Sequence, residues 1–187
     1  MLAQLDRKLR GITATGLQTA SGDYALDAVV FATGFDAVTG AIERMDIRGR
    51  QQRLLKDKWV AGPRAYLGLM VADYPNFFMV TGPGSPSILT NVIVSIEQHV
   101  EWIADLLEHM RAQQQQLVEA QPEAEDSWVR HVAEVAEGTL FTTTNSWYMG
   151  ANVPGKPRVF LPYGGGFHNY AALCREEVAA GYPHFSF

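Results

Sequence analysis

The sequence predicts an α/β fold with helices toward its C-terminal end and long loops between elements. Two apolar runs, at 27–32 and 77–80, have the length and the β-branched or aromatic content of buried strands. The second run is followed by a long stretch with helical periodicity. Buried strands that lead into helices are typical of α/β domains.

Length and composition fit one globular domain. The chain has 187 residues, of which 47% are hydrophobic and 19% are charged, so it can bury a sizeable core. Its net charge of −5 argues against nucleic-acid binding, because no basic stripe is available to neutralise phosphates. The N-terminus lacks the apolar segment of a signal peptide, and no run approaches membrane-spanning length. We therefore expect a soluble cytoplasmic protein without a membrane partner.

Cysteine and histidine usage predicts neither a disulfide nor a metal site. Cys174 is the single cysteine, which fits a reducing compartment, and nothing in its neighbourhood looks activating, so we interpret it as a packing residue. The five histidines do not fall at metal-ligand spacing with cysteines or carboxylates.

The first third of the chain reads as a hairpin that feeds a buried strand. Residues 11–19 are β-prone, 21–23 form a turn, and 27–32 form the buried strand. That strand ends at Thr33 and Gly34, where a glycine lets the backbone approach a ligand or another element closely. Residues 40–65 read as an irregular surface excursion with Trp59 against the core.

A second strand region leads to the stretch around which the chain is organised. Residues 66–71 and 77–80 are predicted strands, and 81–87 form a loop rich in glycine and proline. Beyond it, apolar residues recur at steps of three and four, which predicts a helix capped by Thr90 or Asn91. Its expected buried face consists of Val92, Ile96, Val100, Ile103, Leu107 and Met110.

The loop at 81–87 is the stretch most suited to face a ligand. A strand that passes through a glycine-rich loop into a helix presents backbone N–H groups and the positive end of the helix dipole. An ordinary strand-to-helix turn is the alternative. The loop does not match either of two known motifs. A nucleophile elbow needs glycines two residues before and after the serine, but Pro83 and Ser87 stand there around Ser85. A dinucleotide-binding fingerprint needs a third glycine, and Ser87 occupies that position.

Two further helices and a long loop complete the expected order. Pro122 opens a helix that buries Trp128, Val132 and Val135 and ends at Gly138. Residues 139–157 are long and turn-rich, which suits a functional lid. A short strand at 158–161 and a helix at 170–180, stopped by Gly181, follow.

Three stretches together resemble the Baeyer–Villiger monooxygenases, which are class B flavoprotein monooxygenases. They are 31–36 (FATGFD), 81–87 (TGPGSPS) leading into 95–102 (SIEQHVEW), and 145–157 (NSWYMGANVPGKP). The first is shared widely among flavoproteins with two dinucleotide-binding domains, and the other two are more specific. The resemblance implies a partial FAD-binding domain: residues 1–92 return into that domain, and 93–187 form a helical and loop part that carries an NADP lid.

The resemblance implies a chemistry and a set of roles. The family uses NADPH, FAD and O₂ to insert an oxygen atom beside a ketone carbonyl, giving an ester or lactone. By resemblance, Asn91 and Val92 lie beside the flavin, and Trp147 lies against the NADP ribose. A core or lid-packing role is the alternative for this tryptophan. The residues implied at the substrate side are Pro86, Ser87, Ile88 and Leu89, and Thr33 and Gly34 belong to the cofactor-binding set.

The chain departs from the family by lacking both glycine-rich nucleotide fingerprints. No complete Rossmann domain is expected, no catalytic residue is assigned, and the chain alone is expected to be inactive and to hold no flavin. Its expected partners are a small apolar ketone, O₂, and either its own kind or a separate N-terminal part. Two alternatives stay open: a non-catalytic binding or regulatory remnant, and an enzyme that oxidises nitrogen or sulfur.

Overall fold

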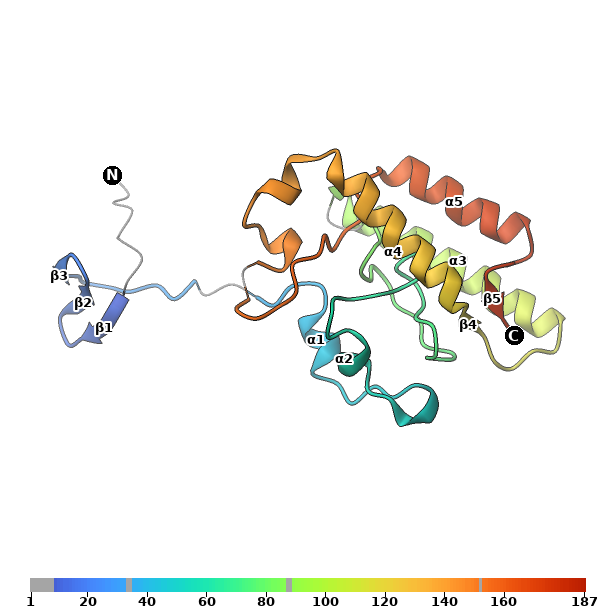
Figure 1. The fold of residues 1–187 in the computed structure, drawn as a ribbon, viewed down its shortest axis with the longest axis horizontal. Coiled ribbons are helices and arrows are strands. Elements are labelled where there is room, and N and C mark those ends of the chain that lie inside the picture. The colour runs from blue at the N-terminus through green and yellow to red at the C-terminus, as the bar shows by residue number, and fades with distance from the viewer. Residues whose placement is uncertain (1–8, 33–34, 87–88, 152) are drawn as a thin grey trace. The chain divides into compact units, whose positions relative to one another are not determined.

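The computed structural model describes residues 9–32, 35–86, 89–151 and 153–187 of the chain. The chain divides into two compact units, residues 1–34 and residues 35–187 (Figure 1). None of the helices in the described ranges is long and apolar enough to cross a membrane. No group of His, Cys, Asp or Glu side chains within those ranges is arranged to hold a metal ion.

The first unit is a small antiparallel meander. Strands β1 (Leu9–Thr13), β2 (Gly16–Thr19) and β3 (Gly22–Ala25) pair in the order β1-β2-β3. The predicted hairpin is therefore confirmed, but an additional turn divides the β-prone residues 11–19 into two strands. This turn lies between Thr13 and Gly16, which face each other in the register of β1 and β2.

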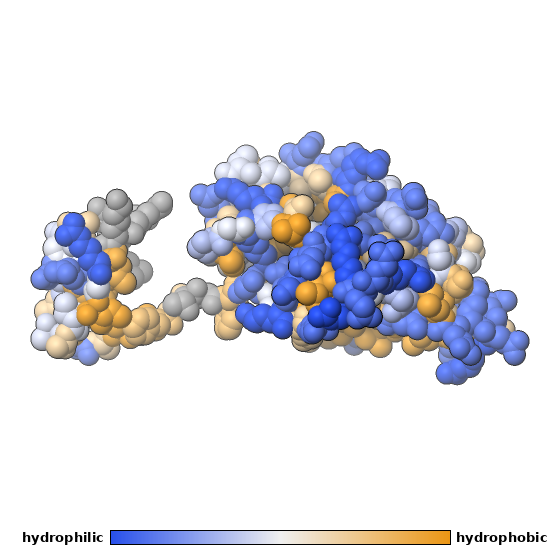
Figure 2. Space-filling model, turned by 60° about the horizontal axis from the view of Figure 1, so that its bottom comes forward, coloured by the Kyte–Doolittle hydropathy of each residue, from blue (hydrophilic) through white to orange (hydrophobic). Residues whose placement is uncertain are grey.

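The buried strand predicted at 27–32 is wrong. None of these residues is in a strand, and Val30 and Phe31 are 87% and 69% exposed. Hydrophobic colouring runs along this segment in Figure 2. A buried strand needs hydrogen-bonded neighbours and apolar cover, and no described strand pairs with this run. Thr33 and Gly34 lie outside the described residues.

The second unit is mainly helical. A two-stranded antiparallel ribbon joins β4 (Glu119–Ala120) to β5 (Phe185–Ser186). Within the described residues, the helices of this unit are α1 (Gly40–Glu43), η1 (Arg50–Gln52), α2 (Leu55–Lys58), α3 (Val92–Ala112), α4 (Pro122–Glu137), η3 (Leu140–Thr143), η4 (Trp147–Met149) and α5 (Phe167–Ala179).

The three long helices share one core. Figure 1 shows α3, α4 and α5 gathered at one side of the unit, and their inner side chains belong to the same apolar cluster, with Trp102, Trp128 and Tyr170 among them. A second cluster lies under α2, where Trp59 is 2% exposed, so its predicted place against the core is confirmed.

The predicted strands at 66–71, 77–80 and 158–161 are not strands. Residues 66–71 are buried, as expected, whereas in 77–80 Met79 alone is buried and Val80 is 43% exposed. Isolated bridges link Met70 to Tyr66 and to Phe78. Left-handed φ angles at Leu67 and Asn76, 55° and 58°, interrupt the extended backbone that a strand needs. The 158–161 segment bonds to the short helix η4 instead: the Leu161 N–H donates to the Tyr148 carbonyl at 2.8 Å.

Helix α3 exists as predicted, but its buried face is different. The expected face is largely exposed: Val92, Val100 and Leu107 show 40%, 51% and 44% of their surface. The buried stripe contains Ser95, His99, Trp102, Leu106 and Met110, so Met110 is the predicted position that is confirmed as buried. This stripe also has helical spacing, and it buries the larger aromatic surface of Trp102. His99 has hydrogen-bond partners in neighbouring segments, while the buried Ser95 hydroxyl has none among the described residues.

The other two helices follow their terminal signals. Pro122 opens α4, and Gly138 is its C-terminal cap. Trp128 and Val132 are buried as predicted, while Val135 is half-buried. Helix α5 begins earlier than expected, at Phe167, and Gly181 follows it with a left-handed φ of 74°, which a side chain would disfavour.

Candidate functional site

The glycine–proline bend at residues 81–86 is built from buried backbone bonds. The Gly82 N–H donates to the Gly68 carbonyl at 3.2 Å, and the buried Ser85 hydroxyl donates to the Gly82 carbonyl at 2.7 Å. Ser85 has no exposed surface. It therefore holds the turn together, which agrees with the sequence argument against a serine nucleophile.

Neighbouring segments fix the far side of the bend. The Gly84 N–H donates to the Leu161 carbonyl at 2.7 Å, and the Ser85 carbonyl accepts from the Tyr163 N–H at 2.8 Å. The Trp128 indole N–H of α4 donates to the Gly84 carbonyl at 3.1 Å. A β-carbon at Gly84 would lie 2.9 Å from that indole nitrogen, so the close approach requires glycine.

A histidine of α3 fixes the near side of the bend. The Nδ1 atom of His99 accepts a hydrogen bond from the Thr81 N–H at 2.9 Å. Its Nε2 atom lies 2.9 Å from the hydroxyl oxygen of Tyr170 in α5. Burial lowers the pKa of His99 from 6.5 to about 4, because the charged ring would be desolvated.

The bend leads to the N-terminus of α3. The Asn91 side chain accepts from the Ile93 N–H at 3.1 Å, so the predicted Asn91 cap is confirmed. Val92, the first helical residue, is 40% exposed. The first-turn N–H groups of a helix lack intrahelical acceptors, so this end can stabilise negative charge on a ligand placed beside it.

The residues implied at the substrate side are not equally accessible. Pro86 is buried and Leu89 is half-buried, and a 2.8 Å hydrogen bond joins the Leu89 N–H to the Pro86 carbonyl. Ser87 and Ile88 lie outside the described residues. Among the four, Leu89 is the described residue with surface available for an apolar ligand.

The loop that carries Trp147 is ordered mainly by contacts near its surface. Trp147 is 37% exposed and stacks on Tyr148, with ring centroids 4.3 Å apart. Ser146 caps the short helix η4 through the Tyr148 N–H. The Arg158 guanidinium donates to the Asn145 side chain at 2.7 Å, and Lys156 forms an ion pair with Asp36.

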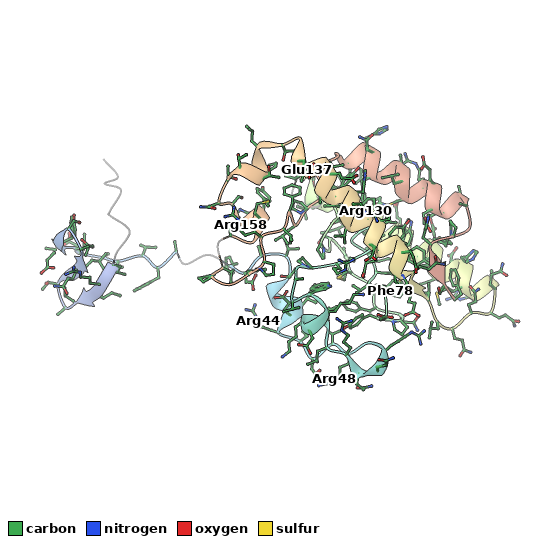
Figure 3. All side chains as sticks on the ribbon, in the orientation of Figure 1. Arg44, Arg48, Phe78, Arg130, Glu137 and Arg158 are labelled. Atoms are coloured by element: carbon green, nitrogen blue, oxygen red, sulfur yellow. The ribbon has the colours of Figure 1, made fainter. Side chains whose placement is uncertain are left out.

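One cavity connects the bend with this loop. It has a volume of about 310 Å³, and its lining includes Pro83 and Gly84 of the bend and Met149 of η4. The wall contributed by α4 and the 158–161 segment is mostly apolar, with Glu137 and Arg158, both labelled in Figure 3, among the polar members. Trp147 lies two residues from Met149 but does not line the cavity. The bend and the loop thus share a hollow, and the indole lies outside it.

Sequence reasoning missed the buried polar residues of the second unit. His99 and Glu125 are 0% and 2% exposed. Glu125 accepts from the Ala72 N–H at 2.9 Å and pairs with Lys58 at 2.9 Å, which ties α4 to the loop at Ala72 and to α2. The available signal was spacing: His99 stands three residues before Trp102, on the same helical stripe.

Cys174 is a packing residue, as expected. It has no exposed surface, and burial raises the pKa of its thiol to about 11. Such a thiol is protonated near neutral pH and is a poor nucleophile.

The chain is similar to curated monooxygenases along almost its whole length. It is 43% identical to the acetone monooxygenase (methyl acetate-forming) of Gordonia sp. (strain TY-5), over 97% of this chain and 34% of that protein. It is 47% identical to a Baeyer–Villiger monooxygenase of Pseudooceanicola batsensis, over 91% of this chain and 31% of that protein. The chain belongs to the Baeyer–Villiger monooxygenase family. It spans about a third of the length of these relatives, and no protein-family profile matches it.

Related chemistry and solved structures are found among the similar proteins. The phenazine N-monooxygenase PhzNO1 of Lysobacter antibioticus is 39% identical over 96% of this chain and 33% of that protein. The NADP⁺-bound cyclohexanone monooxygenase of Rhodococcus sp. Phi1 superposes with a TM-score of 0.90 at 44% identity, over 95% of this chain and 33% of that one. A structure of OTEMO in complex with FAD and NADP gives 0.88 at 33% identity, over 95% of this chain and 32% of that one. The partial α/β architecture of a flavin monooxygenase is therefore established for this Baeyer–Villiger family member.

Proposed function

We propose that this chain forms part of the active site of an FAD- and NADPH-dependent Baeyer–Villiger monooxygenase that converts a ketone into an ester or lactone. The observation that carries the proposal is the hydrogen-bonded bend at 81–86, which lines the cavity that the Trp147 loop shares and is followed closely in sequence by the capped N-terminus of α3. Resemblance to monooxygenases of acetone and cyclohexanone supports the ketone.

The residues present fit the side of a flavin that gains negative charge on reduction. Val92 is partly exposed at the start of a helix of 21 residues, and Asn91 already satisfies the neighbouring N–H of Ile93. Fixed backbone dipoles at such a point need no reorganisation to stabilise charge. FAD and NADPH, when bound, supply the electrons and activate O₂. This chain orients the flavin through Asn91 and Val92.

The substrate and nicotinamide sides are assigned to two separate segments. Leu89, behind the buried Pro86, contributes apolar surface to a small ketone. Trp147, partly exposed on a loop held by short-range contacts, covers the NADP ribose. We assign no catalytic acid or base to the described residues, so the chain binds, orients and excludes water.

The proposal includes a partner. The apolar face of α3 beyond its first turn, with Val100 and Leu107 51% and 44% exposed, and the exposed Val30 and Phe31 are surfaces that a folded protein normally covers. We propose that they are covered by a polypeptide carrying the two glycine-rich nucleotide folds. Self-association of this chain is the competing outcome.

One experiment tests the activity and separates it from the alternatives. The chain is co-expressed with the complementary two thirds of the acetone monooxygenase relative, and the purified material is assayed for flavin absorbance and for NADPH-dependent oxygen insertion. We expect a yellow complex that forms esters from ketones, while the chain alone is colourless. Turnover of amines or thioethers without ketone turnover would replace the ketone assignment with N- or S-oxidation. A colourless self-associated chain that never joins the partner would favour the non-catalytic remnant.

A further inference from the structure

The bend begins at a residue with an unfavourable backbone conformation. Thr81 has a φ of 57°, in the left-handed region that a β-branched side chain rarely adopts. Such a conformation persists only where the surroundings hold it. The contact that holds it is the hydrogen bond from the Thr81 N–H to the Nδ1 atom of His99, at 2.9 Å.

The direction of every hydrogen bond in this cluster is fixed by its two ends. A backbone N–H can only donate, so the Nδ1 atom of His99 is the acceptor and the neutral ring carries its proton on Nε2. That N–H donates to the Tyr170 hydroxyl oxygen at 2.9 Å. The Tyr170 hydroxyl then donates to the Leu67 carbonyl at 2.7 Å, and a carbonyl can only accept.

These hydrogen bonds connect two residues that both have unfavourable backbone conformations. Leu67, at the end opposite Thr81, also has a left-handed φ, of 55°. Both His99 and Tyr170 have no exposed surface, so water cannot substitute for either partner. Loss of one member leaves a buried donor or acceptor unpaired at each neighbour.

The position of His99 gives this cluster a role in the site. His99 lies on α3, about two turns beyond Val92. Thr81, at the start of the bend, is bonded to His99, and Leu89 and Asn91 lead into the same helix at Val92. The imidazole therefore ties the bend to the helix that follows it in the sequence.

We propose that His99, backed by Tyr170, is the positioning residue of the bend: it holds the start of the 81–86 bend on α3, the helix that Leu89 and Asn91 precede and Val92 begins. The role of those three residues rests on the proposed function, but the tether itself does not. His99 touches neither cofactor nor substrate in this scheme. It acts through the Thr81 backbone.

The unsubstituted chain gives the first test. Nitrogen-15 NMR of the histidine rings reports which ring nitrogen carries the proton. We expect His99 in the Nε2–H form near neutral pH, and a slowly exchanging Thr81 amide. A proton on Nδ1, or an ionised ring near neutral pH, would overturn the proposal without any variant. This outcome is independent of flavin binding, so failure of the proposed function would leave it intact.

Two isosteric variants separate the tether from general packing. His99→Asn places an amide oxygen where Nδ1 accepts, and His99→Gln places its amide where Nε2 donates. We expect exchange of the Thr81 amide to accelerate about tenfold or more in His99→Gln and by less than about threefold in His99→Asn. His109→Asn, on the same helix, is the matched control and should change nothing at Thr81.

Tyr170→Phe tests the second half of the chain of bonds. Without the hydroxyl, the Nε2–H of His99 and the Leu67 carbonyl lose their partner, and we expect a mixture of His99 tautomers with partial loss of Thr81 protection. Exchange at Leu106, deeper in α3, monitors folding. Equal acceleration at Thr81 and Leu106 in both His99 variants would reduce His99 to a core residue and contradict the tether.

Discussion

The bend at 81–86 and the loop around Trp147 border the same cavity but are held in different ways. Helices hold the bend, because the His99 imidazole and the Trp128 indole bind its backbone from α3 and α4. The Trp147 loop is held by its own cap at Ser146 and by side chains nearer the surface, such as Arg158. We therefore propose that the bend keeps its conformation, while the Trp147 loop changes conformation when a cofactor binds.

The largest expected effect concerns His99 and acid. Its pKa is lowered from 6.5 in the unfolded chain to about 4 in the folded one, so the unfolded state binds protons first as the pH falls. The free energy of unfolding is therefore unaffected by this group above pH 6.5. It falls by about 3 kcal/mol between pH 6.5 and 4. Urea unfolding across this range measures it. The free energy of unfolding should depend less on pH in His99→Asn than in His109→Asn. The same pH dependence in the two variants would show that His99 does not hold the bend in this way.

The second-largest effect on stability is expected at Trp128, the other helix side chain that binds the backbone of the bend. Trp128→Phe keeps an aromatic ring in the core but leaves the buried Gly84 carbonyl without its indole donor. We expect a loss of about 2 kcal/mol in the free energy of unfolding, measured in urea at neutral pH. A loss below about 0.5 kcal/mol would mean that the indole bond does not hold the bend.

A smaller effect is expected where the Trp147 loop is anchored. Lys156 is 8% exposed and pairs with Asp36, which is 26% exposed. Lys156→Gln should cost about 1 kcal/mol, because a partly buried pair is worth more than a surface one but less than a buried bond to backbone. The exposed Lys56→Gln serves as the matched control. A cost equal to that of Trp128→Phe would erase the distinction between the two regions.

The smallest effect on stability belongs to Trp147 itself. Trp147→Phe should change the free energy of unfolding by less than about 0.5 kcal/mol, because the indole is partly exposed and contacts mainly Tyr148. In the complex with the complementary nucleotide folds, the same variant should weaken NADP⁺ binding, as read by calorimetry. Unchanged affinity together with a large loss of stability would favour the packing role that the sequence left open.

Local signals predicted the three long helices, but the short helices α1 and α2 lie in residues 40–65, which were predicted to be irregular. The tertiary context decided the rest. Asn91, Pro122 and Gly181 mark helix ends through caps and φ preferences that act within a few residues. The run at 66–71 was recognisable as core, but a short apolar run does not distinguish a strand from a buried turn. In the run at 77–80, Met79 alone is buried. The left-handed Leu67 leaves no trace in hydropathy.

The position of the candidate site in the chain was predictable, but the side chains that hold its backbone in place were not. Loop composition and resemblance pointed to 81–92 and to Trp147. The sequence analysis did not identify His99 because its stripe on α3 contains the polar residue Ser95. A neighbouring stripe with the same helical spacing is purely apolar, so it was predicted to be the buried one. Only the partners of His99, Thr81 and Tyr170, far apart in sequence, explain why a histidine is buried there.

Hydrogen exchange followed by mass spectrometry tests the contrast between the two regions most directly. The complex with the complementary nucleotide folds is measured over 81–86 and 144–151, with and without NADP⁺. We predict that the bend exchanges slowly in both states and changes by less than about twofold, while the Trp147 loop exchanges fast and slows by about tenfold with NADP⁺. A bend that exchanges as fast as the loop, or two segments that slow together, would contradict the account.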